Sequence, residues 1–116
     1  MDRIYNLARA IKEVPVTTSE ALTVVAVFRS RPGRERELAN VLGAMLEPTR
    51  AEHGCQRYDL HRVDGDLGQF FFDEIWMTAD DHATHVQSPH VQALLARAPD
   101  LYEWPIVEYK GRRIGD

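Results

Sequence analysis

The chain has 116 residues, of which 44% are hydrophobic and 28% charged, and its net charge is −4. This length predicts one domain that buries roughly 65% of the surface of its unfolded chain. The negative charge and the lack of Lys/Arg runs argue against a nucleic-acid-binding protein, and no apolar run is long enough to span a membrane. A single cysteine excludes an internal disulfide. Because the N-terminus lacks the apolar core of a secretory signal, we expect a cytoplasmic protein.

The first twenty residues are predicted to form a separate arm (residues 1–20) before a domain of residues 21–116. Pro15 and the polar run 17–20 end this arm and act as a connector. We expect the arm to pack on its own domain or on a second copy of the chain. Its predicted amphipathic helix depends on four apolar residues at helical spacing: Ile4, Leu7, Ala8 and Ile11.

Residues 22–29 read as a strand buried on both faces, because apolar and β-branched residues occupy both alternating sets of positions. After a break at 31–33, an apolar stripe predicts a helix from residue 35 to about 52. Pro48 should kink or interrupt its last turn. Gly54 suits the left-handed residue just past a helix end.

Two alternating segments, 55–63 and 69–76, are joined by a short run rich in Asp and Gly, which predicts a β-hairpin. If the turn centres near residues 65–66, Tyr58 lies opposite Glu74. One face then carries a mostly apolar set that suits the side under the helices, and the other carries a mixed set. The first set is Tyr58, Leu60, Phe72, Glu74 and Trp76, and the second is Arg57, Asp59, His61, Phe71, Asp73 and Ile75.

Two short helices follow the hairpin. Thr78 can cap the first, from about residue 79, and Ser88 the second, which begins at Pro89. A last strand is expected at about 103–110, with Pro105 at its edge or outside the ladder. The order βαββαβ predicts an α+β, ferredoxin-like fold: an antiparallel sheet with both helical layers on one face.

Glu74 is out of place among apolar neighbours, because an unpaired buried carboxylate costs several kcal/mol. It must be paired or have a raised pKa. His85, on the helix directly after this strand, is the expected partner. Two interpretations stay open: a catalytic acid/base pair in a pocket, or a hydrogen bond that locks the helix onto the sheet.

Four further residues are candidates for substrate binding. Trp76 could hold a flat aromatic ligand by stacking, or it could belong to the core. Tyr58 could donate to a ligand carbonyl or reach solvent, and Phe72 shares its face. His90 could point into the pocket mouth or stay in water.

Neither a metal nor a bound cofactor is expected. His82 and His85 have a spacing at which two imidazoles can converge, but if His85 points inward His82 should stay in water. No Cys pair or HExxH pattern supports zinc, and no Gly-rich phosphate loop supports flavin or nicotinamide. Cys55 follows a helix end rather than a helix start, so it reads as a small packed residue.

The order of these motifs, from about Leu22 to Ile114, resembles the antibiotic biosynthesis monooxygenase family. The matching pieces are Pro32-Gly33, Gly54-Cys55, Tyr58-Asp59-Leu60-His61, Glu74-Ile75-Trp76, and His85 with Ser88-Pro89-His90. The resemblance implies a dimeric α/β barrel built by face-to-face packing of two sheets. It also implies one of several activities: cofactor-independent oxygenation of phenols and quinols, haem degradation, or isomerisation of a quorum-sensing signal.

The haem-degrading branch of this family uses an Asn in the first strand and a late helical His as iron ligand. These positions fall here at Ala26 and about Leu95, so haem is not expected, although the strand-end Trp matches Trp76. We therefore expect a cofactor-independent monooxygenase acting on a small aromatic, quinol or polyketide-like molecule. The alternatives are a proton-transfer isomerase and a non-catalytic, dimeric small-molecule-binding protein.

Overall fold

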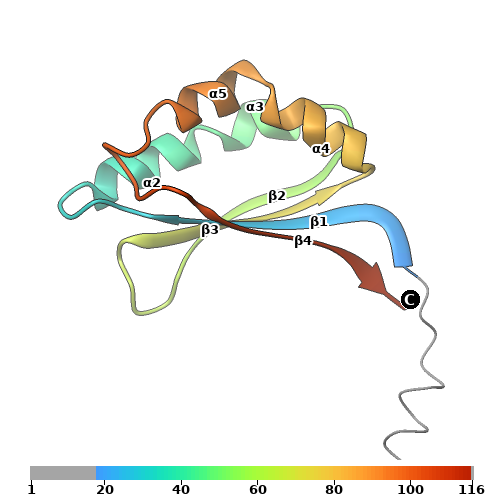
Figure 1. Cartoon of the computed structure of the whole chain (residues 1–116), viewed down its shortest axis with the longest axis horizontal. Helices are drawn as coiled ribbons and strands as arrows, with labels where there is room; N and C mark the ends of the chain where they lie inside the picture. The colour runs from blue at the N-terminus through green and yellow to red at the C-terminus, as the bar shows by residue number, and fades with distance from the viewer. Residues whose placement is uncertain (1–17, 116) are drawn as a thin grey trace, which may run out of the picture.

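The computed structural model describes residues 18–115, so the helix expected in the N-terminal arm lies outside the described residues. Figure 1 shows the helices arranged over one face of a single twisted sheet. The sheet is antiparallel, with strand order β2-β3-β1-β4. The predicted α+β, ferredoxin-like fold is confirmed. Its elements are β1 (Thr18–Arg29), α2 (Glu35–Gly43), α3 (Leu46–Arg50), β2 (Cys55–Arg62), β3 (Gln69–Trp76), α4 (Ala79–Val86), α5 (Pro89–Leu95) and β4 (Val107–Ile114).

Strand β1 differs from its prediction in two ways. It begins at Thr18, so part of the presumed connector belongs to the sheet. It is also buried on one face only in the single chain: Val24 and Ala26 are covered by the helical layer, whereas Val25 and Val27 are half-exposed on the opposite face. The β-branched residues on that second face therefore have no covering layer within the described chain.

The long helix expected over residues 35–52 is two helices. Helix α2 ends at Gly43 and α3 begins at Leu46. A proline ring clashes with the carbonyl group four residues before it, which for Pro48 belongs to Ala44. The break therefore falls one turn earlier than the proline itself.

The hairpin and the helix starts agree with the sequence. Tyr58 pairs with Glu74 in the ladder, as predicted. The hydroxyl of Thr78 accepts a hydrogen bond from the backbone of Asp81 at the start of α4, and Ser88 caps α5 in the same manner. Gly54 has the expected left-handed conformation, with φ of 80°.

Strand β4 begins at Val107 rather than at residue 103, and Pro105 lies outside its ladder, as expected. The connection before it completes the core, because Leu101 and Tyr102 are fully buried. The Tyr102 hydroxyl donates to the carbonyl oxygen of Leu94 at 2.8 Å, which ties this connection to α5. Among the helices that the structure describes, none combines the length and apolar character needed to cross a membrane.

Candidate functional site

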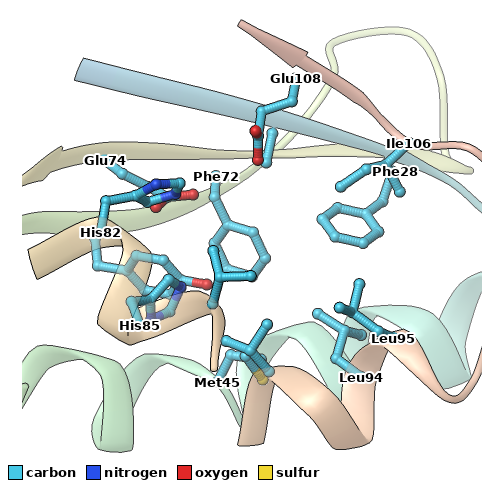
Figure 2. A pocket seen from close by; sticks show the side chains of 14 residues that line it. Phe28, Met45, Phe72, Glu74, His82, His85, Leu94, Leu95, Ile106 and Glu108 are labelled. Carbon is cyan, nitrogen blue, oxygen red and sulfur yellow. The ribbon is translucent and has the colours of Figure 1, made fainter. Parts of the chain in front are cut away.

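A cavity lies between the helix-covered face of the sheet and helices α4 and α5 (Figure 2). Its volume of ≈ 80 Å³ is smaller than the roughly 150 Å³ of an engineered cavity that binds benzene. An aromatic ligand must therefore extend toward Glu108, an exposed lining residue on the sheet edge, or displace side chains. The lining residues are Ala26, Phe28, Met45, Tyr58, Phe72, Glu74, His82, His85, Val86, Val91, Leu94, Leu95, Ile106 and Glu108.

The register of the sheet places Glu74, a polar group, on the floor of the cavity. Glu74 lies between Tyr58 of β2 and Val24 of β1, all on the helix-facing side. Its carboxylate is buried, with 3% of the residue exposed. The indole N–H of Trp76 donates to Glu74 Oε1 at 2.8 Å. This hydrogen bond to a neutral group is the only one that the structure gives Glu74 among the described residues.

Burial raises the pKa of Glu74 to about 7. The Trp76 hydrogen bond opposes this shift, and the negative charges of Glu108, Asp73 and Glu52 reinforce it. Burial is the largest of these effects, and no Lys or Arg of the described residues forms an ion pair with Glu74 that would offset it. Glu74 is thus poised between its neutral and ionised forms at neutral pH.

The hydrogen bond expected between Glu74 and His85 is not formed. His85 Nδ1 instead lies 2.6 Å from Glu52 Oε2. With Glu52 ionised, Nδ1 carries the proton and donates it, which leaves Nε2 unprotonated on a residue that lines the cavity. Burial lowers the pKa of His85, against the opposite influence of Glu52, so the neutral imidazole is favoured. Glu74 and His85 both line the cavity, but their side chains are not hydrogen-bonded to each other.

Glu52 is a candidate site residue that the sequence did not reveal. It follows α3 in a turn that ends at the left-handed Gly54, whose carbonyl oxygen accepts from the backbone of Met77 at 2.8 Å. That hydrogen bond ties the turn to the link between β3 and α4, the helix that carries His85 in its last turn. The sequence signal for Glu52 was its position two residues before a left-handed glycine that precedes a strand pair and a helix.

His90 lies outside the cavity, behind Glu52. Its Nε2 is 3.0 Å from the same Glu52 oxygen that binds His85. The side chain is partly exposed, and it lines a shallow groove with residues of α2 and α5. Its ring centre also lies 6.0 Å from that of His85. Of the two alternatives for His90, the pocket mouth or water, the structure shows a partly exposed side chain that does not line the cavity.

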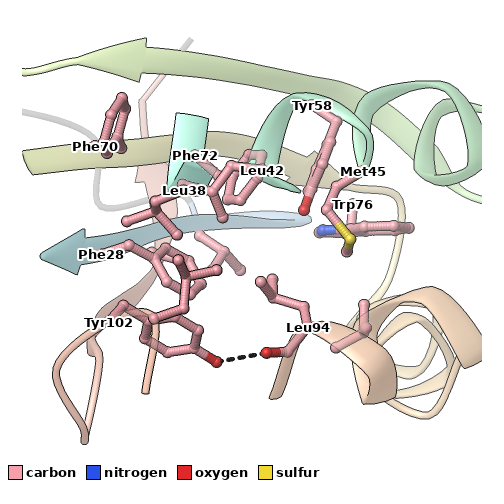
Figure 3. Close-up of a cluster of buried hydrophobic side chains, with 14 of the residues drawn as sticks. Phe28, Leu38, Leu42, Met45, Tyr58, Phe70, Phe72, Trp76, Leu94 and Tyr102 are labelled. Carbon is pink, nitrogen blue, oxygen red and sulfur yellow. Dashed lines mark hydrogen bonds between the residues drawn. The ribbon is translucent and has the colours of Figure 1, made fainter. Parts of the chain in front are cut away.

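His82 lies elsewhere than expected, and Trp76 takes the core position that was one of its two alternatives. His82 is buried and lines the cavity, because α4 rotates this residue inward together with His85. Burial lowers its pKa. Trp76 is fully buried behind the cavity wall, with its ring centre 4.6 Å from that of His85. Figure 3 shows the indole within the core cluster, with its nitrogen on the side of the Tyr58 hydroxyl. Of the predicted binding residues, Tyr58 and Phe72 do line the cavity, and they stack at 4.6 Å.

Glu52, His85 and His90 form the one group of potential metal ligands found among residues 18–115, with ligand atoms within 4.8 Å of one another. Two imidazoles and a carboxylate suit iron(II). The 2.6 Å Nδ1–Oε2 separation is that of a charge-assisted hydrogen bond, however. A metal-bound histidine usually donates its other N–H to an outer partner, and neither histidine has one within the described chain. The geometry therefore fits a hydrogen-bonded network.

The positions that the haem-degrading branch uses also fall on the cavity. Ala26 and Leu95 both line it, and neither side chain can bind iron. Cys55 packs against the core, and burial raises the pKa of its thiol, so it is not an activated nucleophile. The chemistry available in this cavity is proton transfer by imidazole and carboxyl groups.

The class of protein is thus a ferredoxin-like α+β domain with a partly open, largely apolar cavity that contains an oriented histidine. Within that class, the family described as "Antibiotic biosynthesis monooxygenase" matches residues 21–97. The chain belongs to this family, as its motifs indicated.

Relatives of similar size support this membership. The Mycobacterium tuberculosis protein named "Putative monooxygenase Rv0793" is 34% identical over 85 residues, which are 73% of this chain and 83% of that protein. Its solved structure has a TM-score of 0.76 and covers 83% of this chain and 97% of its own. The structure of PA3566 from Pseudomonas aeruginosa has a TM-score of 0.76 at 28% identity and covers 85% and 99%. The chain spans 58% of a longer Synechocystis relative, sll1783, to which it is 24% identical.

Proposed function

We propose that the chain is a cofactor-independent monooxygenase of a small aromatic, quinol or polyketide-like molecule. One observation carries this proposal: His85 lines an apolar cavity while Glu52, at 2.6 Å, holds its Nδ1. A carboxylate on one ring nitrogen fixes the tautomer and leaves the other nitrogen free to accept a proton. Family membership and the monooxygenase names of relatives favour oxygen as the second substrate.

The reaction requires little from the protein beyond proton transfer. His85 Nε2 removes a proton from an activated C–H or O–H group, and the resulting anion passes an electron to oxygen. When a ring CH₂ group is converted to a ketone, one oxygen atom enters the product and the other leaves as water. No external reductant is then needed. Apolar walls formed by Phe28, Phe72 and Leu94 keep water from the intermediate.

We also propose a homodimer that packs the two uncovered sheet faces together. In the single chain this face carries half-buried Val25, Val27 and Ile75, and Tyr109 is 65% exposed. Tyr109 extends the patch because it pairs with Val25 across the β1–β4 ladder. Contiguous apolar surface of this kind marks an interface.

Oxygen consumption by the purified, metal-chelated protein tests the activity. An anthrone-like or catechol/quinol substrate should drive oxygen uptake without added flavin or haem. His85→Ala should lower turnover by roughly 10²-fold or more, the usual scale for loss of a general base. The matched control is His53→Ala, since the His53 side chain is 83% exposed on the same helical side.

Three outcomes separate the alternatives. Equal turnover of the wild type and His85→Ala would remove the base assignment. Exchange of a substrate C–H for deuterium without oxygen uptake would indicate the isomerase. Ligand binding with neither exchange nor uptake would indicate the binding protein.

A further inference from the structure

Glu74 is the one carboxylate among the described residues that is buried. Structures normally give such a group a cation, but here the only donor is the neutral Trp76 N–H, on Oε1. The second oxygen has no hydrogen-bond partner within the described chain, and it is not among the fully enclosed unpaired atoms. Because Glu74 lines the cavity, this oxygen is available to a ligand.

The charges around Glu74 work against its ionised form. Glu108 of β4 lines the same cavity, Glu52 lies behind His85, and Asp73 is the preceding residue. Lys110, a cation on this face, lies two strands away, with Nζ 3.5 Å from Glu108 Oε1. The facing groups of α4, His82 and His85, are both favoured in the neutral state by burial.

We propose that Glu74 acts as a neutral carboxylic acid that donates a hydrogen bond to a phenolate or enolate oxygen formed in the cavity. This rests on the proposed function, in which His85 is the base. His85 Nε2 takes the proton from the substrate, negative charge develops on the substrate oxygen, and the O–H of Glu74 stabilises it. An ionised Glu74 would repel the same anion.

A comparable use of a carboxylic acid is known for a ketosteroid isomerase, where an apolar site keeps an Asp protonated beside a Tyr donor. Here Tyr58 supplies a second O–H in the cavity wall, and burial raises the pKa of its phenol, so it stays protonated. The substrate class that follows is an uncharged ring or ketone that becomes an oxygen anion on losing one proton. Molecules with a permanent carboxylate at this end of the cavity should bind poorly.

Infrared spectroscopy of the ligand-free protein tests the protonation state. At pH 6 the wild type should show a carboxylic-acid C=O band that Glu74→Gln lacks, because ordinary Asp and Glu side chains are ionised there. The band should fade as the pH rises through about 7, the pKa of Glu74. Glu108→Gln, which changes the exposed cavity acid, should keep the band. A wild-type spectrum at pH 6 without a Glu74-dependent band overturns the proposal.

Binding of dinitrophenolate, a phenol that is already ionised throughout this pH range, tests the donor role. Its affinity for the wild type should fall roughly tenfold for each pH unit above the pKa of Glu74. Glu74→Gln keeps an N–H donor at every pH and should bind without this dependence, whereas His85→Gln should retain it. The same pH dependence in Glu74→Gln would overturn the donor role. Phenolate binding through Glu74 without oxygen uptake would refute the proposed function and leave this inference standing.

Discussion

Two neighbouring carboxylates in β3 show how differently the two faces of the sheet are built. Asp73 points to the uncovered face, where its side chain is 30% exposed and lies 3.5 Å from the guanidinium of Arg57. Glu74 points to the helix-covered face, where it is 3% exposed and bonded only to an indole. One carboxylate is solvated and paired, and the other is buried without a cation.

This difference between Asp73 and Glu74 indicates that the two faces of the sheet have different roles. A buried, unpaired acid lowers stability, and proteins keep such groups mainly where chemistry requires them. The covered face therefore carries the candidate site. The uncovered face combines ordinary ion pairs with exposed apolar surface, and it is the face that we propose for a second copy of the chain.

The largest expected effect comes from placing a charge on the uncovered face. Val27 pairs with Phe71 on one side and with Val107 on the other, so it lies in an apolar part of this face. Val27→Asp should raise the dissociation constant of the proposed dimer by roughly 10³-fold or more. Each dimer would bury two unpaired charges, at several kcal/mol each. Sedimentation velocity across a concentration series measures the change.

The control is Thr84→Asp, which adds the same charge at an exposed position of α4. It should leave the dimer intact. A wild-type protein that is monomeric at micromolar concentration would refute the dimer and, with it, this assignment of the two faces.

The sequence was sufficient to assign Glu74 to the covered face. Alternation along β3 has a strict period of two, and the turn near Gly65 sets the register, so Tyr58 had to lie opposite Glu74. The helix caps at Thr78 and Ser88 were predictable for a similar reason, since each depends on contacts within one turn.

The partners of His85 could not be predicted in this way. Glu52 reaches it across 33 residues, through a turn whose path depends on the break before Pro48 and on Gly54. The inward rotation of His82 depends on how α4 sits on the sheet, which side-chain periodicity alone leaves open. Strand alternation thus determines the floor of the cavity, and tertiary packing determines its walls.

The second prediction concerns the stability cost of the buried acid. The pKa of Glu74 rises from an ordinary 4.5 to about 7 on folding, so the folded state favours the protonated form. The free energy of unfolding should therefore fall as the pH rises from about 4.5 through 7, by about 3 kcal/mol in total. Glu74→Gln should remove this loss and be more stable than the wild type at pH 8, but not at pH 4.5.

Urea unfolding at several pH values measures both proteins. Asp80→Asn serves as the control at an exposed position of α4, and it should keep the wild-type decline. An identical pH dependence in the wild type and Glu74→Gln would mean that Glu74 is not the group responsible.

The smallest effect tests how closely the helical layer sits on the covered face. Gly54 and Gly65 have nearly the same left-handed conformation, with φ of 80° and 79°. A Cβ atom at Gly54 would lie 2.2 Å from Asp81 Oδ2 and 2.7 Å from Asp81 Cβ, whereas one at Gly65 meets nothing within 4 Å. Gly65→Ala should cost about 1 kcal/mol of unfolding free energy for its backbone strain. Gly54→Ala should cost about 1–2 kcal/mol more, because the start of α4 must move as well as the Asp81 carboxylate. Urea denaturation of the two variants measures this difference. Equal losses of unfolding free energy would show that α4 can shift without cost and does not pack tightly on the covered face.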